Sequence, residues 1–137
     1  MANSNKAKGT RWESDIVAFL REVFSRLQVW KPRAEGLADV GDIHAPPFAM
    51  QAKNWSSVAE GLRVGVAGAE TQAERAELPY GVAVLKTRGK GAAHGRVVMT
   101  LSTFRRVLAR LLRAERLLQR HAPEAYEQHI YETEQDR

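Results

Sequence analysis

Two short predicted strands, at 41–44 and 48–53, constrain the fold of this chain more than any other stretch. A Pro-Pro pair lies between them and predicts a tight turn, because proline fixes φ and has no N–H to donate to a β-ladder. Side chains alternate along a strand, so Gln51 and Lys53 share one face of the second strand and its apolar residues share the other. Asp42, on the first strand, can point into the same space.

This set of side chains suits phosphate chemistry. A carboxylate, an amide oxygen and an ammonium that converge at one edge of a sheet can hold a divalent cation and a phosphate together. A lysine on the polar face of a strand with an apolar back is also an unusual pattern for the centre of a sheet. The stretch therefore predicts a site as well as a hairpin.

A resemblance to a known family rests on these residues. Asp42 and the Gln51-x-Lys53 pair follow Glu13, which lies on a predicted N-terminal helix. In this order they resemble the PD-(D/E)xK nuclease superfamily and, within it, the archaeal and phage Holliday junction resolvases. The resemblance spans most of the chain, and the matching pieces are Lys8-Gly9-x-x-x-Glu13, Arg33 with Gly36, Gly41-Asp42-Ile43 and Gln51-Ala52-Lys53-Asn54.

The resemblance implies a Mg²⁺ site, in which Mn²⁺ can substitute. Its ligands would be the carboxylates of Glu13 and Asp42, the side-chain oxygen of Gln51 and the backbone carbonyl of Ala52. Lys53 would orient or deprotonate the attacking water, or steady the phosphate, so the expected catalytic residues are Glu13, Asp42, Gln51 and Lys53. The family usually carries an acid where this chain has Gln51, and a neutral amide attracts Mg²⁺ less strongly.

The implied function is a metal-dependent, structure-selective DNA endonuclease that resolves four-way (Holliday) junctions. A homodimer is expected, because such a junction needs two symmetric cuts. Two alternatives remain open: a nuclease of the same fold that acts on linear duplex or a restriction-type target, and a non-catalytic DNA-binding relative. The basic residues expected to contact DNA are Lys8, Arg11, Arg33, Arg88 and Lys90.

Three of the predicted site residues also have other interpretations. Thr10 and Glu13 have the spacing of a capping box, in which the glutamate needs no metal. Asp39 lies close to Asp42 in sequence and could take its role. Lys53 could be a solvent-facing lysine on an edge strand. The complete set favours the site over these alternatives.

Periodicity and turn signals predict an α/β fold, a mixed β-sheet flanked by helices in the order α-β-β-β-α-β-β-α. This is the core of the restriction-endonuclease-like fold. The predicted helices are 10–27, 57–77 and 102–120, and the predicted strands are 27–33, 41–44, 48–53, 80–86 and 96–101. Glycines 61, 65 and 68 interrupt the middle helix, which calls for close packing on the sheet or on another chain, or for close passage of a DNA backbone.

Length and charge fit this interpretation. The 137 residues suit one nuclease domain, 10–120, with a flexible N-terminus, 1–9, and an acidic C-terminal tail, 121–137, in which a short helix is predicted. The net charge is +5, and the stretch from Lys86 to Arg120 is strongly basic, with Glu115 as its one acid. A basic body with an acidic tail favours a polyanionic partner.

The composition also bounds the compartment. The chain has no cysteine, so it has neither disulfides nor a thiolate metal site. No apolar run is long enough to span a membrane, and the N-terminus lacks the apolar segment of a signal peptide. We therefore expect a protein with no membrane partner that works in the cytoplasm, or in the host cytoplasm if a phage encodes it.

Overall fold

The computed structural model describes residues 3–33, 39–54 and 58–135. By their internal contacts the residues separate into two compact units, Met1–Thr100 and Leu101–Arg137. The sequence alone suggested a later boundary, at residue 120. The sheet and its covering helices belong to the first unit, and a pair of helices forms the second.

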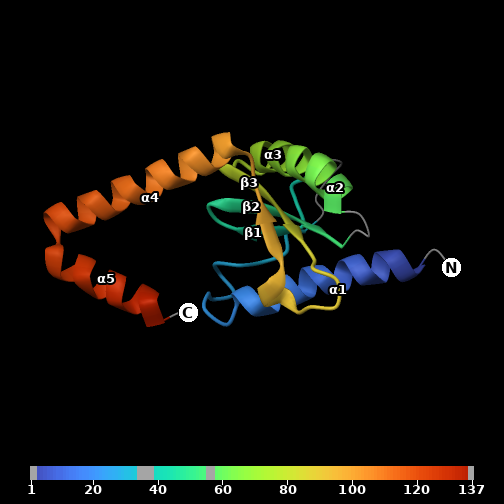
Figure 1. Cartoon of the computed structure of the whole chain (residues 1–137), viewed down its shortest axis with the longest axis horizontal. Coiled ribbons are helices and arrows are strands. Elements are labelled where there is room, and N and C mark those ends of the chain that lie inside the picture. Colours follow the sequence, from blue (N-terminus) through green and yellow to red (C-terminus); the bar gives the residue numbers. More distant parts are fainter. Residues whose placement is uncertain (1–2, 34–38, 55–57, 136–137) are drawn as a thin grey trace. The chain divides into compact units, whose positions relative to one another are not determined.

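A four-stranded mixed sheet forms the centre of the first unit (Figure 1). Its strands are β1 (Ile43–Ala45), β2 (Phe48–Lys53), β3 (Tyr80–Leu85) and β4 (Arg96–Val98), and they lie side by side in that order. β1 and β4 run antiparallel to their neighbours, whereas β2 and β3 are parallel. The predicted α/β class with a mixed sheet and flanking helices is confirmed, and the predicted hairpin joins β1 to β2.

A helical segment carries the chain from β2 to β3, as parallel strands require. It consists of α2 (Val58–Glu60), the π-helical η1 (Gly61–Gly65) and α3 (Val66–Arg75). Together they cover most of the helix predicted at 57–77. Ser57, which would cap this helix, and Gly36 of the family motif lie outside the described residues.

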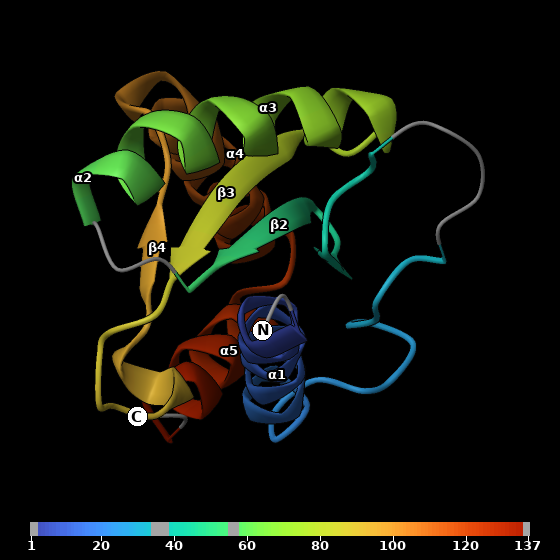
Figure 2. The same ribbon diagram turned by 90° about the vertical axis from the view of Figure 1, so that its right-hand side faces the viewer.

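Different helices cover the two faces of the sheet (Figure 2). α1 (Asn3–Leu20) packs against one face and α3 against the other. The α1 side holds the apolar core, and Met50 and Ala52 of β2 pack against that core. Gln51 and Lys53 consequently face α3, as strand alternation predicted. The buried members of the core are Trp12, Ile16, Val17, Val29, Ile43, Val82 and Val84.

The approach of α3 to the sheet depends on glycine. A Cβ on Gly81 in β3 would collide with the backbone carbonyl of Ala69 in α3. On the helix side, a Cβ on Gly65 would lie 3.3 Å from the Cβ of Ala83. Close packing on the sheet therefore accounts for Gly65, one of the three glycines that interrupt the predicted helix.

The first helix is longer at its start and shorter at its end than the sequence predicted. It begins at Asn3, so part of the predicted flexible N-terminus is helical. Thr10 lies inside the helix, where its hydroxyl donates to a backbone carbonyl one turn earlier, and the capping-box interpretation of Glu13 is wrong. The helix ends at Leu20 and not at Leu27.

The strand predicted at 27–33 is also wrong, because only one antiparallel bridge forms there, between Trp30 and His44. The guanidinium of Arg21 donates to the carbonyl of Val29 from Nε at 3.0 Å and from Nη2 at 2.8 Å. In the register of this bridge the next residue pairs are 28 with 46 and 32 with 42. Each pair contains a proline, which has no N–H to donate, so the ladder does not extend.

The second unit is a pair of helices, α4 (Leu101–His121) and α5 (Pro123–Gln135). Pro123 opens α5 at the first helical position, where the missing N–H costs nothing. The apolar row of α4 remains partly exposed, with Phe104 at 47% and Leu111 at 49%. In the described part of the chain, no helix is both long and apolar enough to cross a membrane.

Candidate active site

The site is built around Asp42, which lies directly before β1. Its backbone N–H donates to the carbonyl of Met50 at 3.0 Å, and its carboxylate Oδ2 accepts from the N–H of Ala52 at 2.8 Å. The carboxylate is therefore held against β2, the strand that carries Gln51 and Lys53. It is half-buried, which makes its environment matter for its charge.

Three further charged side chains act on this carboxylate. Burial raises the pKa of Asp42 above its ordinary value of 3.8, and the N–H of Ala52 lowers it. The negative charges of Glu13 and Asp39 raise the pKa further, whereas the ammonium of Lys53 lowers it. Glu13 on α1 and Lys53 on β2 thus lie near enough to Asp42 for their charges to influence its pKa.

Glu13 lies on α1 and forms a salt bridge with Lys31. Its Oε2 lies 3.5 Å from Nζ of Lys31, which also donates to the Ser14 hydroxyl at 3.0 Å. The sequence reasoning missed Lys31, since nothing in the sequence links it to a helix so far upstream. The lysine offsets part of the negative charge that Glu13 and Asp42 bring together.

The backbone of Ala52 faces the same edge as Asp42. In a strand, the N–H and C=O of one residue point to the same side. The N–H of Ala52 points at Asp42, while the next carbonyl, that of Lys53, accepts from the N–H of Lys86 on the β3 side at 3.0 Å. The carbonyl of Ala52 is thus directed towards the edge where a metal ligand was predicted.

Gln51 is at the centre of a hydrogen-bonded network on the α3 face. Its Nε2 donates to the carbonyl of Gly65 at 2.9 Å, in the π-helical turn. Its oxygen accepts from Nζ of Lys53 at 3.0 Å and from Nε2 of Gln72 at 3.1 Å. A Cβ on Gly68 would lie 2.8 Å from the end of the Gln51 side chain, so this glycine leaves the amide its room.

Both lone pairs of the Gln51 oxygen are therefore in use. In this arrangement Gln51 orients Lys53, and it would have to release a donor before it could bind a metal. The sequence indicated that Gln51 and Lys53 share a face, but the direct contact between them depends on how α3 lies over the strand.

Gln72 connects this network to Asp39. It is buried, with 4% of its surface exposed, and its Nε2 donates to Oδ2 of Asp39 at 2.6 Å. The other Asp39 oxygen accepts from the N–H of Gly41 at 3.1 Å, while Oε1 of Gln72 has no hydrogen-bond partner. Asp39 and Asp42 thus occupy different places in the candidate site: Asp39 contacts Gln72, and Asp42 contacts Ala52.

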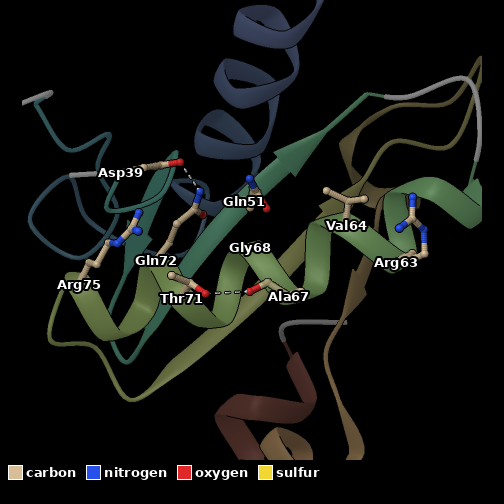
Figure 3. Close-up of a pocket in the computed structure, with 9 residues that line it drawn as sticks. All are labelled: Asp39, Gln51, Arg63, Val64, Ala67, Gly68, Thr71, Gln72 and Arg75. Carbon is tan, nitrogen blue, oxygen red and sulfur yellow. Dashed lines mark hydrogen bonds between the residues drawn. The ribbon is translucent and has the colours of Figure 1, made fainter. Parts of the chain in front are cut away.

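A cleft of about 520 Å³ opens along this face of α3 (Figure 3). Gln51 and Gln72 line its inner wall, and Asp39 lies near one end. The remaining lining residues come from the helical segment: Arg63, Val64, Ala67, Gly68, Thr71 and Arg75. The two arginines were not predicted as site residues. The available signal was their spacing, because Arg63, Ala67, Thr71 and Arg75 follow one another at intervals of four residues in a predicted helix.

The chemistry of the donors suits Mg²⁺, which prefers oxygen ligands and keeps several waters. The edge offers the carboxylates of Glu13 and Asp42 and the carbonyl of Ala52. No group of three His, Cys, Asp or Glu side chains within the described ranges lies close enough together to hold a metal ion. Metal binding here would therefore rely on backbone, amide and water oxygens besides the two carboxylates.

The basic residues predicted to contact DNA are all exposed. Lys8 and Arg11 lie on α1, and Arg33 follows the Trp30 bridge. Arg88 and Lys90 lie in the loop before β4, which is closed by hydrogen bonds from Lys86 Nζ to the Lys90 carbonyl and from the Thr87 hydroxyl to the His94 carbonyl. The structure gives these cations solvent access.

Comparison with protein-family models, curated proteins and solved structures finds no match to this chain. The assignment of a function consequently rests on the site itself.

Proposed function

We propose that this chain is a metal-dependent DNA endonuclease whose active site is built around Asp42. The observation that carries the proposal is the convergence of Glu13, Asp42 and Lys53 from three separate elements, at a half-buried carboxylate that Ala52 holds in place. Two carboxylates and an ammonium at the edge of a mixed sheet form a set suited to binding a cation together with a phosphate.

Hydrolysis of a phosphodiester needs charge relief at the transition state and a nucleophilic water, and Mg²⁺ supplies both when bound. Asp42 and Glu13 provide the negative charge that holds the cation. Lys53, which donates to the Gln51 oxygen at 3.0 Å, is fixed in direction and can steady the phosphate or orient the water. Lys31 beside Glu13 adds positive charge at the anionic edge.

The order α1, β1, β2, α3, β3 around a mixed sheet is compatible with the core of a restriction-endonuclease-like fold. Within that fold we favour a four-way DNA junction as the substrate, cut by a homodimer that presents two sites related by a two-fold axis. This choice rests on the motif order Glu13, Asp42, Gln51, Lys53, which resembles that of junction resolvases.

One observation favours a second candidate, a DNA-binding relative without nuclease activity. The Gln51 oxygen already accepts hydrogen bonds from Lys53 and Gln72. The side chain at the position where the resembled family usually has an acid therefore binds protein donors and not a metal. A protein of this kind would still bind junctions through its basic surface, but it would not cut them.

The deciding experiment is cleavage of a labelled synthetic four-way junction beside a linear duplex of the same sequence, with Mg²⁺ and with EDTA. The proposal predicts paired, symmetric cuts in the junction only when Mg²⁺ is present. Cleavage of both substrates would indicate a nuclease with another target, and tight binding without cleavage would favour the non-catalytic relative.

A further inference from the structure

The cleft along α3 has the features of a binding surface for a polyanion. Arg63, Ala67, Thr71 and Arg75 follow one another at intervals of four residues, which places them along one side of the helical segment. The arginines therefore lie at the two ends of the row, with small side chains between them (Figure 3).

Both arginines are available for a ligand. They are exposed, and neither forms a salt bridge with any residue that the structure describes. The one acid that lines the cleft, Asp39, already accepts hydrogen bonds from Gln72 and from the N–H of Gly41. Asp39 keeps its negative charge at one end, so the two arginines leave the cleft with a net positive charge of one. The middle of the cleft is uncharged, and there the Thr71 hydroxyl donates a hydrogen bond to the carbonyl of Ala67.

The middle of the cleft is also low enough for a close approach. Gly68 has no side chain, and Ala67 and Thr71 have short ones, so the Gln51 amide is reachable from outside. Since Gln51 contacts Lys53 directly, a strand lying in this cleft would pass beside the residue that we propose acts at the phosphate.

The spacing of the arginines suits one nucleic-acid strand. Arg63 and Arg75 are twelve residues apart on a helical path, a separation of roughly 18 Å at about 1.5 Å per residue. Along one DNA strand that distance covers about five nucleotides at about 3.4 Å each. A backbone held at both ends would therefore expose its central phosphates to the middle of the cleft.

We propose that the sugar–phosphate backbone of the substrate strand lies along this cleft, held by Arg63 and Arg75 on either side of Gln51. The proposal deepens the nuclease function and rests on it for the substrate class. It differs from the basic surface predicted from sequence, because Arg63 and Arg75 lie on the helical segment that covers the face opposite α1.

The test is DNA binding without cleavage, measured by fluorescence anisotropy of a labelled four-way junction in EDTA from about 50 to 200 mM salt. Arg63→Gln and Arg75→Gln should each make the negative slope of log affinity against log salt less steep by about 0.9, and the double variant by about 1.8. Arg26→Gln is the matched control, since Arg26 is an exposed arginine that follows α1 and does not line the cleft.

The possible outcomes separate this inference from the nuclease function. A double variant with the slope and affinity of the Arg26→Gln control would overturn the strand path, even if the wild-type protein cuts junctions. Loss of slope in the arginine variants, in a protein that never cuts with Mg²⁺, would support the strand path and remove the nuclease function. Melting temperatures equal to that of the wild type would show that the variants fold.

Discussion

Gln51 occupies a position where a neutral amide and an acid would behave differently. Its oxygen accepts from Lys53 and Gln72, and its nitrogen donates to the carbonyl of Gly65. A glutamate has no donor for that carbonyl, but it offers a full negative charge to Lys53 and to a cation. In this structure the amide therefore fixes the positions of Lys53 and Gln72.

We predict that Gln51→Glu still folds and lowers the Mg²⁺ concentration needed for half-maximal cleavage. The added negative charge attracts the cation more strongly than a neutral amide does. The measurement is cleavage rate against Mg²⁺ concentration.

Gln28→Glu adds the same charge away from the site and can still accept from the N–H of Ser25, so it should leave the Mg²⁺ requirement unchanged. If Gln51→Glu needs as much Mg²⁺ as the wild type, or more, Gln51 does not act on the metal. Its role would then be limited to holding Lys53 and Gln72.

The Asp42 carboxyl should also make the free energy of unfolding depend on pH. Because burial raises its pKa in the folded state, the folded protein binds a proton more readily than the unfolded chain. Asp42 therefore contributes stability below about pH 3.8, and this contribution is lost as the pH rises through the folded-state pKa. An asparagine at this position has no such dependence.

We predict that the melting temperature of the wild type, relative to that of Asp42→Asn, falls as the pH rises from below 3.8 towards neutrality. Thermal unfolding of both proteins across that range measures the difference. A constant difference would mean that the environment of Asp42 does not disfavour its charge, and the electrostatic description of the site would be wrong.

At the scale of residues, the sequence predicted that Gln51, Lys53 and Asp42 lie near one another. Alternation in β2 is enough to put Gln51 and Lys53 on one face, and the hairpin is enough to bring Asp42 beside the same strand. Asp42 lies directly before β1, however, and not within the first strand as predicted. The contact of Gln51 with Gln72, and of Glu13 with Lys31, could not be predicted. Both depend on how a helix lies on the sheet, which periodicity within one element does not determine.

At the scale of elements, the β2–α3–β3 unit positions the site. α3 can lie on the sheet only because β3 carries glycine where the Ala69 carbonyl approaches. Gly9 offers a contrast, since it lies in α1 and a Cβ there would meet nothing within 4 Å.

We predict that Gly81→Ala destabilises the protein by about 3 kcal/mol, the upper end of the cost of overpacking. Gly9→Ala, the matched control, should stabilise it by about 1 kcal/mol, because alanine favours a helix interior. Denaturant unfolding of the two variants provides both values. Equal stabilities would mean that α3 does not pack on β3 as closely as described.

The elements that the sequence missed have local causes. The predicted strand at 27–33 fails because the N–H groups of Gln28 and Val29 donate to the carbonyl of Ser25 in a turn. The prolines at 32 and 46 also lack the N–H groups that would extend the ladder on either side of the bridge. The start of α1 was missed because its first turns are polar and carry Gly9, features that usually indicate a loop. Strands with strong apolar runs, such as β3, were predicted within a residue.

At the scale of the whole molecule, the basic stretch of the sequence is divided between two units. Arg88, Lys90 and Arg96 belong to the first unit, whereas α4 carries six arginines in the second. The charge pattern alone therefore indicates a polyanionic partner but not the surface that binds it. The cleft of α3 adds Arg63 and Arg75, which lie outside that basic stretch.

The most direct test of the nuclease function is the effect of Asp42→Asn on junction cleavage and on junction binding. The substitution removes one ligand charge but keeps an oxygen that can accept from the N–H of Ala52. We predict that cleavage of a four-way junction in Mg²⁺ falls by about 10³-fold, the scale of loss when one stabilising group is removed from an active site. Binding in EDTA and the fold at neutral pH should be retained. Turnover at the wild-type rate would contradict the account, remove Asp42 from the site and direct attention to Asp39.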